Sequence, residues 1–483
     1  TQYLYRMDRI EKLEKQRVGK LILSFSLPAI IGMMVTASYN IVDRIFVGKG
    51  VGALAISGIT VTFPMILIFM AFGMLVGVGA TAIVSLRLGE KRHNDAEATL
   101  GNAFTLVLII STVLMLLGYI FLNDFLIAFG GSGEVLEYAR EYSIIILAGT
   151  IFQFTAFSLN NIIRGEGNPK TAMATMLIGS ILNIILNPLF IFGLKLGIRG
   201  SALATVISQF VSCTWVLSYF LGKRSHLKFR ISNLRLRKEI VMKIFSIGIS
   251  PFSMMIASSV IMVIYNQSLS SYGGDIAIAV FGIGNSLINF IMMPVFGINQ
   301  GIQPIIGYNY GAKLFSRVRD TLRLASIWAT VVCTAGFAIV MIFTPQVISL
   351  FSKDDPSLLS LGTSATRMFL SSLPIVGFQV VNGAYFQAVG KAKFSLILTL
   401  FRQVIILTPL LFIFPALMGL NGVWWAEPVS DGISAILSAI FIMNEFRLLN
   451  RNIISGKSSS DDFKTVESSI EAITENSGEK IIP

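Results

Sequence analysis

Residues 101–122 read GNAFTLVLIISTVLMLLGYIFL, an apolar stretch that contains no charged side chain. A helix of about 20 such residues crosses the roughly 30 Å hydrocarbon core of a bilayer. Comparable apolar runs begin near Val18, Ala53, Tyr142, Thr171, Gly200, Lys243, Ile276, Leu324, Arg367, Phe394 and Val423. The sequence therefore predicts an all-α integral membrane protein with twelve transmembrane helices, and this even number puts both termini on one side.

The composition supports a membrane location. Of the 483 residues, 54% are hydrophobic and only 13% are charged, and the mean hydropathy is +0.74. A soluble domain carries about 25% charged residues. The composition excludes a soluble globular protein and a disordered chain. The two cysteines, Cys213 and Cys333, fall within apolar runs, so we expect neither a disulfide framework nor a metal framework.

The net charge of +12 would suggest nucleic acid in a soluble protein, but its distribution indicates topology instead. Most of the 38 Lys and Arg residues lie before the first apolar run, in alternate loops and after the last run; these stretches are 6–20, 87–92, 164–170, 223–243, 313–323, 391–393 and the tail from 447. Basic loops remain on the cytoplasmic side. We therefore expect both termini in the cytoplasm and no nucleic-acid partner.

The two halves of the chain resemble each other. Gly-Glu-Lys at 89–91 is matched by Gly-Ala-Lys at 311–313, and the same separation relates Gly79 to Gly301 and Ala55 to Ala277. Each half has six predicted spans, so the halves should form two lobes related by a pseudo-twofold axis along the membrane normal. The expected units are a cytoplasmic segment 1–17, an amino-terminal lobe 18–222, a basic cytoplasmic linker 223–242, a carboxy-terminal lobe 243–447 and a disordered cytoplasmic tail 448–483. The linker is expected to be a solvated loop, with contact to anionic lipid headgroups as the alternative.

Three carboxylates, Asp43, Glu427 and Asp431, fall within apolar runs. An ionisable group at membrane depth costs roughly 3 kcal/mol or more, so it is retained with a partner or for transport. Asn183 and Asn187 are one turn apart and share a helix face. Together with Asp43 they could surround a small cation, which prefers oxygen ligands. The alternatives are an interfacial anchor for Asp43 and helix-to-helix hydrogen bonds for the amides.

Arg402 and Asp431 are predicted to pair. Arg402 is expected about 12 Å from the cytoplasmic face and Asp431 about 12 Å from the outer face. In a hydrocarbon core about 30 Å thick, their levels then differ by only about 6 Å. Glu427, one turn from Asp431, is a competing partner for Arg402. Such a pair either is a static structural contact or changes its charge balance when a substrate or proton arrives.

Uncharged amides are also common within the runs. Examples are Gln153, Asn160, Asn266, Asn382 and Gln403. They suit a water-containing cavity or a gate that handles varied amphipathic molecules. Pro28 removes a backbone donor from the first helix and is a candidate hinge, although Pro is also common in transmembrane helices.

The sequence resembles the MATE (multidrug and toxic compound extrusion) transporters, in particular their bacterial DinF-type and MepA-type branch. The resemblance covers residues 28 to about 448. The motifs that carry it are Tyr39-Asn-Ile-Val-Asp43, the two Gly-x-Lys repeats, Gly165-Glu-Gly-Asn-Pro169, Asn183-Ile-Ile-Leu-Asn-Pro188, Arg402-Gln403 and Glu427-Pro-Val-Ser-Asp431.

The resemblance implies an amino-lobe cation site. Its members would be Asp43, Tyr142, Asn183, Asn187 and Thr205, with sodium as a possible ligand of Asp43, Asn183, Asn187 and Thr205. Many relatives have an acid where this chain has Asn187, so the coupling ion, a proton or sodium, stays open. The family also suggests that Pro28 bends the first helix.

The function expected from the resemblance is cation-coupled export of amphipathic, often cationic, drugs from a prokaryotic cytoplasmic membrane. The protein would act as a monomer among membrane lipids, by alternating access and without a cofactor. The alternatives are a flippase for lipid-linked sugars and an intramembrane enzyme. Arg402 is the only cation expected at depth, which is few for binding a pyrophosphate. His93 and His226 fall in loops, which disfavours an enzyme.

Overall fold

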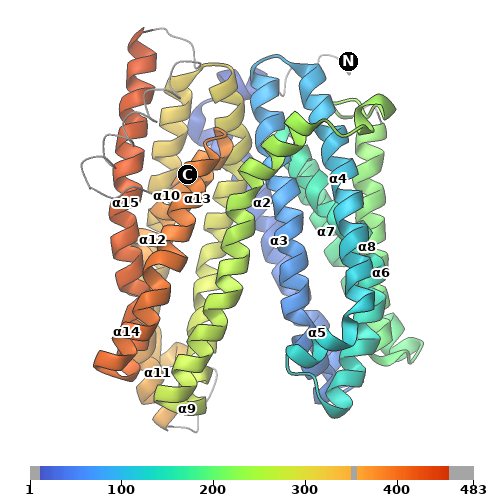
Figure 1. The fold of residues 1–483 in the computed structure, drawn as a ribbon, viewed down its shortest axis with the longest axis vertical. Helices are drawn as coiled ribbons and strands as arrows, with labels where there is room; N and C mark the ends of the chain where they lie inside the picture. Colours follow the sequence, from blue (N-terminus) through green and yellow to red (C-terminus); the bar gives the residue numbers. More distant parts are fainter. Residues whose placement is uncertain (1–10, 223, 350–355, 456–483) are drawn as a thin grey trace.

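The computed structural model describes residues 11–222, 224–349 and 356–455. These residues form helices and connecting turns, without a strand among them. Figure 1 shows the amino-terminal helices in blue to green beside the carboxy-terminal helices in lime to red. The first group comprises α2 (Val18–Gly50), α3 (Ala53–Gly89), α4 (His93–Ile120), α5 (Leu122–Ala128), α6 (Gly133–Gly165), α7 (Pro169–Pro188), a π-helical turn (Leu189–Gly193) and α8 (Gly197–Leu221).

A short 3₁₀ helix (Ile231–Leu234) leads into the second group. This group comprises α9 (Lys238–Gly311), α10 (Phe315–Ser349), α11 (Pro356–Phe369), α12 (Leu373–Ala388), α13 (Ala392–Leu400), a π-helical segment (Phe401–Leu407), α14 (Thr408–Met418) and α15 (Leu420–Ser455). Helix α9 holds two spans, because Gly274 interrupts it with a φ of 64°. The last helix, α15, ends at Ser455 and so extends beyond the predicted lobe boundary at residue 447.

The predicted number of membrane spans agrees with the structure. Eleven helices of the described residues are long and apolar enough to cross a membrane, and a bent pair brings the number to twelve. The pair consists of Leu359–Phe369 and Leu373–Ala388, which meet at 44°. The sequence predicts that this span begins near Arg367, but Arg367 lies inside α11. Most other helices begin several residues before their apolar runs, because a helix continues into the headgroup layer after its side chains become polar.

Hydrogen bonds hold parts of the basic linker against α4, although most of its described residues are exposed. The side chain of Asn102 on α4 accepts from the backbone N–H of Arg237 at 2.7 Å and donates to the carbonyl of Asn233 at 3.1 Å. Glu97 forms an ion pair with Arg230 at 3.0 Å, and Leu227 is buried. Polar groups at the start of α4 thus hold the linker against the amino-terminal lobe, and α9 already begins at Lys238.

The internal repeat is visible in the backbone. Lys91 and Lys313, the last residues of the two Gly-x-Lys motifs, both adopt a left-handed conformation, with φ of 62° and 60°. Non-glycine residues seldom do so. Gly52 and Gly274, at matching positions between the first two spans of each half, also have positive φ. Equivalent residues of the two halves therefore form equivalent turns.

The two lobes meet through backbone-to-backbone contacts at the end of the molecule that holds the Gly-x-Lys turns. A Cβ atom on Gly311 would lie 2.2 Å from the carbonyl oxygen of Leu86, and one on Gly89 would lie 2.0 Å from that of Tyr308. The two contacts are reciprocal, because the repeat relates Leu86 to Tyr308. Only glycine permits this approach, so these residues close one end of the two-lobed structure.

We expect Gly311→Ala to separate the lobes at this end, because its Cβ would overlap the Leu86 carbonyl. Spin labels at the exposed residues Arg92 and Ser316 would report the change as a longer inter-label distance. Gly282→Ala on the same helix is the matched control, since a Cβ there meets nothing within 4 Å. An unchanged distance distribution in Gly311→Ala would show that the contact does not hold the lobes together.

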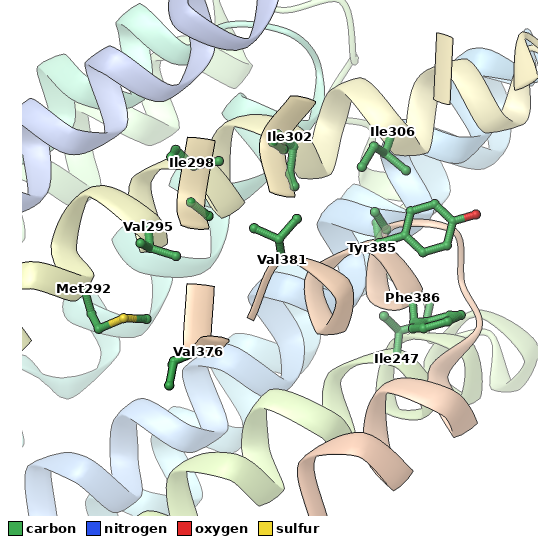
Figure 2. Packing of buried hydrophobic residues seen from close by; sticks show 14 of the residues in the cluster. Ile247, Met292, Val295, Ile298, Ile302, Ile306, Val376, Val381, Tyr385 and Phe386 are labelled. Atoms are coloured by element: carbon green, nitrogen blue, oxygen red, sulfur yellow. The ribbon is translucent and has the colours of Figure 1, made fainter. Parts of the chain in front are cut away.

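Inside the carboxy-terminal lobe, apolar side chains of α9 and α12 pack into a buried core. Figure 2 shows Val295, Ile298, Ile302 and Ile306 along one face of α9, with Val381 of α12 beside them. Each of these side chains is almost fully buried. The spacing of three and four residues places them on a single helix face.

Candidate functional site

A buried polar cluster joins α2, α7 and α8 of the amino-terminal lobe. Asp43 is 9% exposed, Asn183 is 2% exposed, and Asn187 and Ser201 are fully buried. Asn183 and Asn187 face the same way because they are one helical turn apart. The structure therefore brings Asp43 to the amide pair, and the hydrogen bonds of the amides also join α7 to α2 and α8, so this geometry fits both a cation site and helix-to-helix hydrogen bonding.

Hydrogen bonds connect these side chains in a row. The amide nitrogen of Asn187 donates to Asp43 Oδ1 and to Asn183 Oδ1, the latter at 3.2 Å. The amide nitrogen of Asn183 donates to Thr205 Oγ1 at 3.1 Å. Tyr142, buried on α6, interacts with Thr205 in turn. All five residues of the expected amino-lobe cation site therefore lie in one connected cluster.

Ser201 is a member of this cluster that sequence reasoning missed. Its hydroxyl donates to Asp43 Oδ1 at 2.8 Å. It lies on α8 one turn before Thr205, so the i,i+4 spacing that pointed to Asn183 and Asn187 was also present here. The missing signal was the position of α8 relative to Asp43, which depends on helix packing.

The charge balance of this cluster suits a monovalent cation or a proton. Asp43 supplies one negative charge, and its hydrogen-bond partners Asn187 and Ser201 are uncharged. The oxygen Oδ1 of Asn187 is buried and accepts no hydrogen bond. A carboxylate with a free amide oxygen beside it matches the oxygen ligands that small hard cations prefer.

A second polar cluster lies in the carboxy-terminal lobe. Arg402 Nε is 2.7 Å from Asp431 Oδ1, which confirms the predicted pair. Arg402 Nη2 lies 3.7 Å from Glu427 Oε1. Tyr265 donates to Glu427 Oε2 at 3.2 Å, and Ser372 donates to Asp431 Oδ2 at 2.7 Å. The cluster thus contains two carboxylates and one guanidinium.

The local backbone helps to position Arg402. It lies in the π-helical segment Phe401–Leu407, a wider turn that often marks functional sites. The hydroxyl of Ser430 donates to the Arg402 carbonyl at 2.8 Å, which ties this segment to α15 beside Asp431.

The remaining predicted cavity residues do not form one cluster with this group. Gln403 donates to Ser258 at 2.9 Å, and Asn382 donates to Ser438 at 3.1 Å. Gln153 and Asn160 lie on α6 of the other lobe, and Asn266 is exposed on α9. Pro28 lies within α2, which continues as one helix from Val18 to Gly50.

The sequence did not predict the burial of several charged groups, among them Arg164, Lys391 and Glu445. Arg164, assigned to a loop, is 6% exposed within α6 and donates to Gln300 of the opposite lobe. Arg164 is thus a second guanidinium within the helices, and it is more deeply buried than Arg402. Lys391 binds both oxygens of Glu445 at 2.8 Å, and both side chains are buried. Both arginine and lysine lie near span ends, where sequence alone does not separate loop from helix.

Comparison with known proteins identifies the family. The sequence model of the MatE family matches residues 28–189 and 251–413, once in each half. This chain belongs to the MATE family. The two matched regions begin at the equivalent prolines Pro28 and Pro251, as expected for a tandem repeat of this MATE unit.

Named MATE relatives and solved MATE structures cover most of the chain. The multidrug export protein MepA of Staphylococcus haemolyticus is 30% identical over 440 residues, which is 91% of this chain and 96% of the relative. The structure of the MATE multidrug transporter DinF-BH in complex with R6G is 40% identical, with a TM-score of 0.83, covering 88% of this chain and 95% of that one. A MATE crystal structure in the bent conformation has a TM-score of 0.86 at 27% identity, covering 92% and 98%. These similarities confirm the twelve-helix, two-lobed fold and identify a transporter, not an enzyme.

Proposed function

We propose that this protein exports amphipathic drug-like compounds across a cell membrane in exchange for protons or sodium ions. The named relatives, a multidrug export protein and a multidrug transporter, support the drug substrates. The positive-inside distribution of Lys and Arg supports a topology with both termini in the cytoplasm. The protein would work as a monomer, because each copy of the chain contains both lobes.

The observation that carries the coupling is the environment of Asp43. This carboxylate is 9% exposed, and its hydrogen-bond partners are neutral. The neighbouring Arg44 is exposed and compensates this buried charge only in part, so binding a cation or a proton there is favourable. The net charge of the Asp43 cluster then depends on whether the coupling ion is bound.

Coupling requires that the ion and the drug favour different states of the same equilibrium. If a cation at Asp43 stabilises one arrangement of the lobes and drug stabilises the other, each ligand weakens the binding of the other. The Gly89 and Gly311 contacts hold the lobes together at the end of the basic loops. With that end in the cytoplasm, the described arrangement would be closed to the cytoplasm. Gln153, Asn160, Asn266, Asn382 and Gln403 remain candidates for drug contact or gating, and Pro28 for a hinge.

A flippase for lipid-linked sugars is the alternative transport function. Its pyrophosphate substrate requires several cationic groups in one place. Arg402, which is partly buried, is paired with Asp431, and the buried Arg164 is bonded to Gln300 on the other side of the lobe interface. These contacts favour drug export.

Drug efflux from vesicles containing the purified protein tests this function. A proton gradient and a sodium gradient would be imposed separately, with R6G as the fluorescent probe. We expect uphill R6G movement with one of the two gradients and none without a gradient. Equal R6G movement with and without both gradients would contradict coupled export.

Asn187→Asp should change the number of coupling ions. The variant puts a second carboxylate beside Asp43, and two adjacent carboxylates do not readily ionise together without an additional cation. We expect a steeper dependence of R6G export on the concentration of the coupling ion. Asn123→Asp, at an exposed residue of α5, adds the same charge at the surface and is the matched control. An unchanged concentration dependence in Asn187→Asp would remove Asn187 from the cation site.

A further inference from the structure

The two polar clusters occupy equivalent places in the two lobes. The residue separation that relates Gly89 to Gly311 also relates Asp43 to Tyr265 and Thr205 to Glu427. In the amino-terminal lobe the carboxylate is on the first helix and the hydroxyl on the last. In the carboxy-terminal lobe the first span of α9 supplies the hydroxyl and α15 supplies the carboxylate. The repeat therefore preserves a polar contact between the first and last helices of each lobe but moves its acid to the opposite helix.

The carboxy-terminal cluster carries one uncompensated negative charge. Asp431 is 2% exposed and has a close guanidinium at 2.7 Å as well as a hydroxyl donor at 2.7 Å. Its charge is therefore satisfied. Glu427 lies one helical turn away, and its ion pair with the same guanidinium is longer, at 3.7 Å. Like charges at this spacing repel each other.

Glu427 is also the accessible member of the pair. Its side chain is 22% exposed, whereas that of Asp431 is 2% exposed. The ionisable groups facing Glu427 are Tyr265 from α9, Arg402 from the π-helical segment and Asp431 from α15 itself. Glu427 therefore combines access with an excess of negative charge.

We propose that Glu427 is a proton-binding site of the carboxy-terminal lobe, additional to the cation site at Asp43. This inference rests on the proposed function, because it gives each lobe of the transporter one carboxylate whose charge can be neutralised. A proton fits better than a metal cation, since Arg402 would repel a metal ion at this distance. Among the described residues, no group of three or more His, Cys, Asp and Glu side chains is arranged to hold a metal.

Protonation of Glu427 has a defined local consequence. It removes the excess charge and leaves the Arg402 guanidinium to Asp431 alone. Since Arg402 joins the π-helical segment to α15, this change acts on the contact between two spans of the carboxy-terminal lobe.

Infrared difference spectroscopy of the full chain in lipid membranes tests the inference directly. A pH titration without drug would follow the carbonyl band of protonated carboxylic acids. In the wild type we expect a component that is retained in Asp43→Asn and absent in Glu427→Gln. Glu134→Gln, at an exposed residue of α6, is the matched control and should retain it.

A second Glu427 variant tests the same assignment if Glu427→Gln is unstable. If Glu427→Gln does not fold, Glu427→Asp should retain a carboxylic acid but shift the frequency of this component. A component unchanged in both position and size in every foldable Glu427 variant overturns the inference. Because no drug is present, this result is independent of the vesicle assay, so a protein that fails to export R6G would contradict the proposed function alone.

Discussion

Asp43→Asn is expected to abolish drug export while leaving the protein folded and inserted. Asparagine has nearly the same shape as aspartate, and its side-chain oxygen can still accept from Asn187 and Ser201. The variant loses only the negative charge that would attract the coupling ion. Cells that produce it should accumulate R6G as strongly as cells without the protein, which can be measured by fluorescence at matched protein levels.

Two controls separate coupling from folding. Asp124→Asn makes the same chemical change on exposed α5 and should leave export unchanged. Thermal unfolding of purified Asp43→Asn should be close to that of the wild type. Full export by this variant at equal expression would show that the charge of Asp43 is not required.

Arg402→Gln should cause the largest loss of stability. The substitution leaves Asp431, which is 2% exposed, without its counter-charge and next to Glu427. Removing one member of a buried pair typically costs about 3–5 kcal/mol. Since the Arg402 side chain is 24% exposed, we expect a value near the lower end of that range. Because the unfolding entropy grows with chain length, the unfolding temperature of the lipid-bound protein should fall by about 3 °C.

A double variant tests the physical reason for this loss. Arg402→Gln with Asp431→Asn removes one charge of each sign and restores the net charge of the cluster. We expect it to recover most of the lost stability, because contacting residues are not additive. If Arg402→Gln alone unfolds at the wild-type temperature, the pair contributes nothing measurable.

The polar clusters were predictable from sequence to the extent that helix geometry determines them. The i,i+4 spacing placed Asn183 and Asn187 on one face, and the depths of Arg402 and Asp431 in their spans predicted their contact. Ser201 and Tyr265 were missed because their contribution depends on how helices rotate about their own axes. An apolar run reports the length of a span, but it leaves that rotation open.

The fold was predictable where composition changes sharply and less so at span ends. Apolar runs and the Gly-x-Lys repeat predicted the number of spans and the two lobes. Arg164 was assigned to a loop because it lies close to Gly167, where α6 has already ended. The linker was expected in solvent because it is basic, but the side chains of Asn102 and Glu97 bind its backbone and Arg230. Such contacts between distant segments leave no local periodicity.

The central claim is that Asp43 binds the coupling ion, and the most direct test is whether a drug gradient drives uphill ion transport that requires Asp43. Vesicles with wild-type protein would receive an R6G gradient, and the internal proton and sodium concentrations would be followed. We predict uphill movement of one of these ions in wild-type vesicles and none with Asp43→Asn. Equal uphill ion movement by both proteins would contradict the assignment of Asp43 as the coupling carboxylate.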